Sequence, residues 1–169
     1  TQDFYVGIDT NPPTTPAVSH GSQLAFKPSG STASVTLTLT AATDQANQSD
    51  SGIAEHRLYR RTASLLTPTS ALVGGCGTWS TSSQLQWNSS GVLQSSGWNQ
   101  VATWSGNTMP ATYTDTLSEG CYDYVLVAID NVGNYNVSAM TNNTYTADPW
   151  TNWCQYGGPL GLSCMFTAG

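Results

Sequence analysis

Several acidic and amide side chains stand just beyond two strand-like stretches, where they could bind a metal ion. Asp44 and Asp50 belong to a polar loop, and Asp130 and Asn134 belong to the turn DNVGN. If both segments lie at one end of a domain, these side chains converge as hard oxygen ligands of the kind that Ca²⁺ prefers. Alternatively, they cap their own turns by accepting hydrogen bonds from nearby backbone amides. A calcium site is therefore one of two interpretations.

Four tryptophans lie in a stretch that is otherwise rich in Ser, Thr, Gly and Asn: Trp79, Trp87, Trp98 and Trp104. Planar rings beside amides can stack on sugar rings, so these residues could form a glycan-binding platform. The alternative is that a long insertion with few charges needs large apolar groups for a satellite core.

General acid–base or nucleophilic chemistry has little to build on in this chain. Of its two histidines, His20 lies in an expected loop and His56 in an expected strand, where a partly buried structural role is favoured. There is no Gly-x-Ser-x-Gly elbow, His-Glu-x-x-His motif or phosphate-binding glycine loop. We therefore expect neither an enzyme nor a bound cofactor.

The cysteines predict two disulfide bonds: Cys76, Cys121, Cys154 and Cys164. Four cysteines allow three pairings, and the close spacing of the last two suggests a local pair that leaves Cys76 with Cys121. A zinc site would need a closer cysteine pair or nearby histidines. Disulfides in turn predict an oxidising compartment.

Four Asn-x-Ser/Thr sequons support an extracellular or cell-surface glycoprotein: Asn47, Asn88, Asn136 and Asn142. Each sequon is weak evidence alone in a chain of this composition. The chain begins at Thr1 without Met, as a processed mature protein or an excised fragment would. No apolar run approaches the roughly 20 residues that span a bilayer, so no membrane span is expected.

The composition predicts a folded domain with an unusually uncharged surface. Charged residues make up 8% of the 169 residues, against about 25% in typical domains. Six Trp and eight Tyr supply core material. The net charge of −6 argues against a nucleic-acid partner, which needs a basic patch. The one basic cluster, Arg57, Arg60 and Arg61, is expected on a strand with acidic neighbours.

Period-two alternation predicts the strands that must position these residues. In Ser34–Ala41, Val35, Leu37 and Leu39 face a core while the intervening threonines face solvent. Further strands are expected at Ile53–Arg61, Ser83–Trp87, Trp98–Trp104, Thr112–Thr116, Gly120–Asp130 and near Tyr135–Tyr145.

The strand that begins at Gly120 is apolar on both faces. One face carries Tyr122, Tyr124, Leu126 and Ala128. The other carries Val125, Val127 and Ile129. Because the outer face of an antiparallel sheet is normally polar, something must cover it. The candidates are the Trp-rich insertion, the C-terminal tail and another subunit.

In this order, three segments resemble a fibronectin type III or related bacterial immunoglobulin-like β-sandwich module: DTNPPTTPAV, DSGIAEHRLYRR and ATYTDTLSEGCYDYVLVAIDNVGN. The last contains the family's Tyr-x-Tyr-x-apolar-x-Ala-x-Asp pattern and its Asp-Asn-x-Gly-Asn turn. The resemblance covers about 100 residues, and it implies a tyrosine corner at Tyr122, whose hydroxyl would bond to upstream backbone.

The resemblance also implies a domain organisation. Residues 1–16 would be an extended N-terminal segment with a Pro-rich linker, and residues 17–147 an all-β, immunoglobulin-like sandwich with a Trp-rich insertion at about 62–107. Residues 148–169 would form a disulfide-containing tail packed on the sandwich.

The function expected first is an extracellular structural or adhesive module that assembles into a cell-surface filament. In that hypothesis, the N-terminal strand is donated to a neighbouring copy, and head-to-tail repetition makes a filament. The inserted side chains would be Phe4, Tyr5, Val6 and Ile8. The alternative is a carbohydrate-binding accessory module of a larger secreted enzyme.

Overall fold

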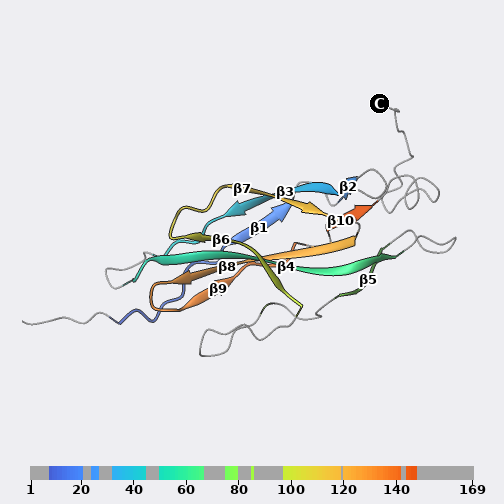
Figure 1. Ribbon diagram of the computed structural model, residues 1–169. Helices are drawn as coiled ribbons and strands as arrows, with labels where there is room; N and C mark the ends of the chain where they lie inside the picture. Colours follow the sequence, from blue (N-terminus) through green and yellow to red (C-terminus); the bar gives the residue numbers. More distant parts are fainter. Residues whose placement is uncertain are drawn as a thin grey trace, which may run out of the picture.

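The computed structural model describes residues 8–20, 24–26, 32–44, 50–66, 75–79, 85, 97–118, 120–141 and 144–147. Within them lie ten β-strands and no helix (Figure 1). Their bounds are β1 Ala17–His20, β2 Leu24–Phe26, β3 Ala33–Thr40, β4 Ile53–Leu66, β5 Gly75–Trp79, β6 Asn99–Ser105, β7 Thr112–Leu117, β8 Gly120–Asp130, β9 Tyr135–Val137 and β10 Thr144–Ala147. The described part therefore contains no helix that could cross a membrane.

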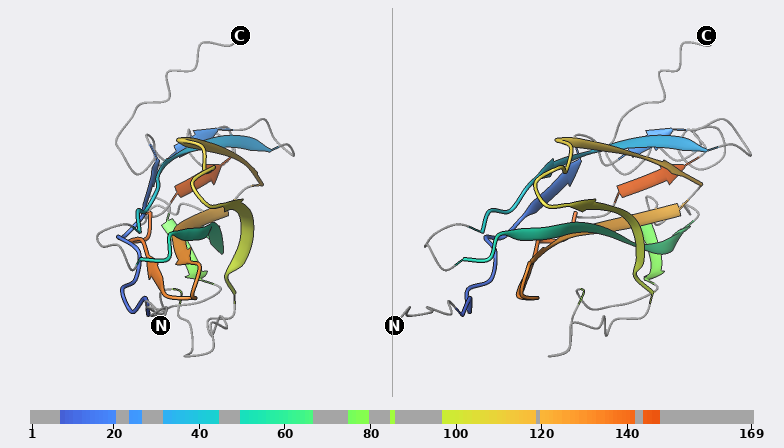
Figure 2. Two further views of the ribbon diagram at one scale, coloured as in Figure 1. Left: turned by 90° about the vertical axis from the view of Figure 1, so that its left-hand side faces the viewer. Right: turned by 60° about the vertical axis from the view of Figure 1, so that its left-hand side comes forward.

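The strands form two sheets that pack face to face as a β-sandwich (Figure 2). The smaller sheet has the order β1-β3-β7, and the larger has the order β2-β10-β8-β4-β5, with β6 also paired to β4 and β9 to β8. Neighbouring strands are antiparallel except β2 and β10, which are parallel. The predicted all-β class and sandwich arrangement are confirmed.

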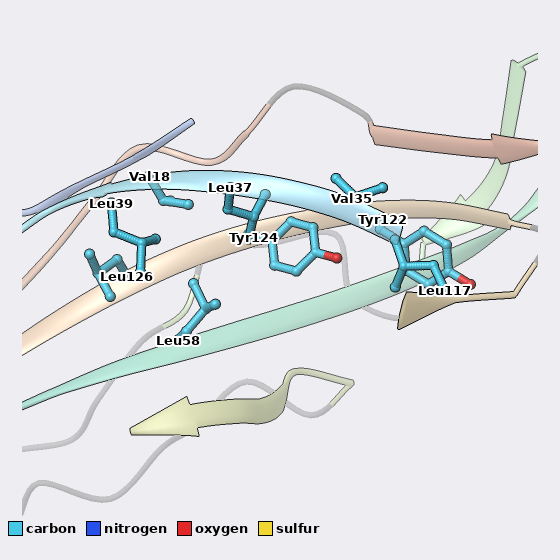
Figure 3. Packing of buried hydrophobic residues seen from close by; sticks show 9 residues of the cluster. All are labelled: Val18, Val35, Leu37, Leu39, Leu58, Leu117, Tyr122, Tyr124 and Leu126. Atoms are coloured by element: carbon cyan, nitrogen blue, oxygen red, sulfur yellow. The ribbon is translucent and has the colours of Figure 1, made fainter. Parts of the chain in front are cut away.

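The main core lies between the two sheets (Figure 3). In β3, Val35, Leu37 and Leu39 are buried and the threonines between them are exposed, as the alternation predicted. They meet Leu58 of β4 and the predicted inner face of β8. The core side chains are Val18, Val35, Leu37, Leu39, Leu58, Leu117, Tyr122, Tyr124 and Leu126.

The outer face of β8 carries a second core. Val125 and Val127 are fully buried there, together with Tyr59 of β4. Leu85 and Trp98, both from the expected insertion, pack on these side chains. Half-buried residues of β9 and the segment after it complete the cluster: Tyr135, Val137 and Met140. The required cover thus comes in part from the Trp-rich insertion.

The strand predicted near Tyr135–Tyr145 is observed as two strands, β9 and β10. Between them, two side-chain hydroxyl groups accept hydrogen bonds from β8 amides, in the place of backbone carbonyls. Ser138 Oγ accepts the Leu126 N–H at 2.9 Å, and Thr141 Oγ1 accepts the Tyr124 N–H at 3.0 Å. Their own amides donate to the carbonyls of Leu126 and Tyr124. The edge of β8 therefore stays hydrogen-bonded where the regular ladder is interrupted.

The tyrosine corner that the resemblance implied is present. The hydroxyl of Tyr122 donates to the carbonyl of Ser118 at 2.9 Å, four residues upstream. Gly120 lies between them, and a Cβ atom at this position would come within 3.3 Å of the Tyr122 hydroxyl oxygen. The hydroxyl thereby fastens the short β7–β8 connection to the start of β8.

Candidate functional site

The proline-rich segment before β1 is held against one end of the sandwich. Pro13 is buried, and its carbonyl accepts a hydrogen bond from Asn136 Nδ2 at 3.1 Å. The amide of Thr14 donates to the carbonyl of Thr43 at 2.8 Å, and the Thr43 amide donates back to Thr14 Oγ1. The segment expected to be a linker is therefore part of the folded domain from about Asp9 onward.

Docking of this segment brings three carboxylates together. Single oxygen atoms of Asp9, Asp44 and Asp50 all lie within 4.8 Å of one another. Asp44 follows β3 and is 5% exposed, while Asp50 stands shortly before β4. Carboxylate oxygens at this spacing are suitable ligands for a hard divalent cation. We call this group the linker acid cluster.

The surroundings shift the pKa values of Asp44 and Asp9 in opposite directions. Burial raises the pKa of Asp44, and the charges of Asp9, Asp130 and Asp50 raise it further, while a hydrogen bond from the Gly52 amide opposes both. In contrast, the neighbouring Ser51, whose backbone amide donates to Asp9 Oδ2 at 2.7 Å, lowers the pKa of Asp9. Of these two carboxylates, Asp44 is the one whose negative charge is less well compensated.

Asp130 and Asn134 do not join the cluster as ligands. Asp130 Oδ1 accepts the amides of Val132 and Asn134 at 2.9 and 2.8 Å, and its Oδ2 accepts Asn134 Nδ2 at 2.8 Å. These are the turn-capping bonds of the alternative interpretation. The two loops do lie at the same end, because the Asn131 amide donates to the Gly52 carbonyl.

An open cleft of about 430 Å³ borders the linker acid cluster. Asp44 is its acidic lining residue, and the remaining wall is small or neutral: Ala41, Ala42, Thr43, Ile53 and Asn107. The cleft could admit a hydrated cation to Asp44 from solvent.

His56 has a structural role. The ring is fully buried beside this end of the sandwich, with Nε2 accepting the Ala42 amide at 3.1 Å and Nδ1 3.2 Å from the Gly106 carbonyl. This geometry fits a neutral ring that carries its proton on Nδ1. Burial lowers the pKa of His56, which favours the same neutral form.

Two of the four candidate platform tryptophans have described side chains, and both pack into the protein. Trp98 is 6% exposed in the outer core, and the Arg61 guanidinium lies 5.4 Å from its ring centroid. Trp104 is half-buried and meets Tyr113 edge to face at 5.9 Å. Trp98 therefore fits the satellite-core alternative, whereas Trp104 packs at the margin of the main core. The Trp79 side chain and Trp87 lie outside the described residues.

Each arginine of the basic cluster forms a salt bridge with a carboxylate. Arg57 pairs with Glu55, Arg60 with Asp115 at 2.7 Å, and Arg61 with Asp123 at 2.7 Å. The second pair joins the two sheets, and Tyr124 also donates its hydroxyl to Asp115. The third is almost completely buried beneath Trp98. These cations stabilise the fold and offer no basic surface.

The remaining predicted residues are only partly described. Cys121 is fully buried and disulfide-bonded, while the side chains of Cys76, Cys154 and Cys164 lie outside the described residues, so the pairing stays a prediction. Of the sequons, Asn136 is described and its amide binds the linker. Asn47, Asn88 and Asn142 lie outside, as do Phe4, Tyr5 and Val6 and the tail 148–169. Ile8 is described and is 77% exposed.

Asp9 was missed by the sequence reasoning. It lies 35 residues before Asp44, with the prolines between them, and only docking of the linker brings it to the cluster. The acidic residue at the start of DTNPPTTP was the available signal. No family model matches the chain, and no curated protein matches it. What is established is therefore an all-β sandwich with an acidic N-terminal junction.

Proposed function

We propose that this protein is an extracellular structural or adhesive module of the immunoglobulin-like or fibronectin type III-like kind, and that it assembles into a filament. The N-terminal strand of one copy is donated to the next. The tyrosine corner at Tyr122 supports the finer family assignment.

The observation that carries this proposal is the anchored linker with an exposed apolar residue at its outer end. Residues from Asp9 onward are tied to loops of the sandwich, whereas Ile8 is 77% exposed. Val132, in the β8–β9 turn at the same end, is 58% exposed. Both are large apolar side chains that a protein partner at this end of the sandwich would cover. The N-terminal segment therefore joins the folded domain at the anchored Asp9, and Ile8, the residue before it, is exposed to solvent.

An extracellular location is supported by the chemistry of Cys121. Its disulfide bond requires an oxidising environment to form and persist. The low charge of the chain and its sequons agree with that location. Glycosylation of Asn136 would compete with its hydrogen bond to Pro13, so occupancy is expected at the other sequons first.

Removal of residues 1–8 tests the proposal. The shortened chain keeps Asp9 and the linker contacts, so it should fold as a monomer that no longer assembles. The full chain should form fibres in electron micrographs and sediment as large species. If the full chain stays monomeric at every concentration tested, or if the shortened chain still forms fibres, the proposal fails.

The alternative function is carbohydrate binding as an accessory module of a larger secreted enzyme. Burial of Trp98 and the packing of Trp104 leave Trp79 and Trp87 as the residues on which a platform would depend. A glycan array probed with the wild type and with a Trp79→Ala, Trp87→Ala double variant distinguishes the two functions. Binding that the double variant loses would favour this alternative.

A further inference from the structure

One edge of strand β7 has no partner strand in the part of the chain that the structure describes. Among the described residues this strand pairs only with β3, and it is the last strand of the smaller sheet. The other end of that sheet is β1, which is shorter and directly follows Pro16. Figure 2 shows β7 and β6 as the edge strands of the two sheets on the same side of the sandwich.

The register shows which groups of β7 point away from the sheet. The Leu39 amide donates to the Ala111 carbonyl at 2.8 Å, and the pairing continues with Leu37 opposite Tyr113. Because hydrogen-bonded and non-bonded pairs alternate in an antiparallel ladder, Tyr113 and Asp115 direct their backbone groups toward β3. The outward N–H and C=O groups belong to the remaining positions: Thr112, Thr114 and Thr116.

Apolar side chains line the space beside this edge. Half-buried residues at the margin of the main core come from β6, β7 and the loop between them: Val101, Ala102, Trp104, Met109 and Tyr113. A strand added to β7 would direct every second side chain into this margin. The N-terminal segment has the matching pattern, because Phe4, Val6 and Ile8 occur at alternate positions.

We propose that the outer edge of β7 accepts residues 2–8 of a second copy as an additional strand. β7 has six residues, and the donated segment has a similar length. The backbone ladder supplies affinity, while Phe4, Val6 and Ile8 face the apolar margin and Tyr5 faces outward. This inference rests on the proposed function, and it adds the place where the neighbouring copy binds.

Substitution Thr114→Pro tests the acceptor. Proline removes the outward amide of Thr114 without removing a ladder bond to β3, and edge strands tolerate proline at such positions. Thr114→Ala is the matched control, because it loses the hydroxyl contact with Thr36 but keeps the amide. We expect the proline variant to fold by circular dichroism and remain monomeric, whereas the alanine variant assembles.

Two further measurements separate the inference from the proposed function. A peptide of residues 1–8 should bind the chain that lacks them, and hydrogen exchange at Thr112, Thr114 and Thr116 should slow on binding. Val6→Asp in the peptide should abolish binding, while Tyr5→Asp should not. If the full chain forms fibres but Thr114→Pro forms them equally well, β7 is not the acceptor and the proposed function stands. If the full chain is monomeric with these amides protected, the strand folds onto its own domain and both ideas fail.

Discussion

Replacement of Trp98 by alanine is expected to destabilise the protein strongly, although Trp98 lies outside the space between the sheets. The side chain is 6% exposed and covers Val125 and Val127, which are fully buried. A tryptophan buries roughly 200 Å², which at about 25 cal/mol per Å² corresponds to about 5 kcal/mol. Measured aromatic-to-alanine changes in cores are about 3–5 kcal/mol. We therefore expect the free energy of unfolding to fall by about 4 kcal/mol.

The assay is equilibrium unfolding in urea under non-reducing conditions, followed by far-UV circular dichroism. Val132→Ala is the control, because Val132 is also apolar but 58% exposed, and its change should stay within about 0.5 kcal/mol. A loss below about 1 kcal/mol for Trp98→Ala would refute the outer core described above. A residue of an exposed glycan platform would show the opposite result, with lost binding and unchanged stability.

Three other predictions follow from single contacts. Burial lowers the pKa of His56, so the unfolded chain takes up a proton before the folded chain does as the pH falls below about 6.5. The free energy of unfolding should therefore decline by up to about 1.4 kcal/mol per pH unit toward pH 5. Urea titrations at a series of pH values should show this slope for the wild type and not for His56→Gln. Tyr124→Phe should cost about 1–3 kcal/mol, because Asp115 loses a buried hydrogen bond; an unchanged unfolding midpoint would contradict that. Millimolar Ca²⁺ should raise the melting temperature and chelator should reverse the rise, whereas Asp44→Asn should abolish the response; a wild type indifferent to both would exclude the cation site.

The strands and their buried faces could be predicted because their signals are local. In β3, each apolar residue alternates with threonine, and this period of two alone identifies the inner side. The same reasoning showed that β8 is apolar on both faces, which required a second layer. The cover was found at Leu85 and Trp98, but sequence could not choose among insertion, tail and partner, since each offered apolar groups.

The acidic site could be predicted only in part because its contacts join distant segments. Asp44 and Asp50 belong to one loop and were found together, while Asp9 reaches them through the docked linker. Asp130 has the right residue type, but it caps its own turn and is not among the carboxylates whose oxygens lie within 4.8 Å of one another. Residue type and loop position therefore identify candidate ligands, while contacts between distant segments decide which carboxylates come together.

The two cores also limit how this protein could assemble. An outer sheet face that is already covered cannot serve as a broad apolar interface, and the buried ion pair Arg61–Asp123 beneath Trp98 would resist exposure. Among the described residues, the outer edge of β7 and the end that carries Ile8 are two surfaces still open to a partner. The edge of β7 offers free backbone groups, and Ile8 belongs to an N-terminal segment in which apolar residues occur at alternate positions. Such a pair is complementary without being identical, so repeated contacts between them would build a head-to-tail chain, whereas reciprocal exchange between two copies would build a closed dimer.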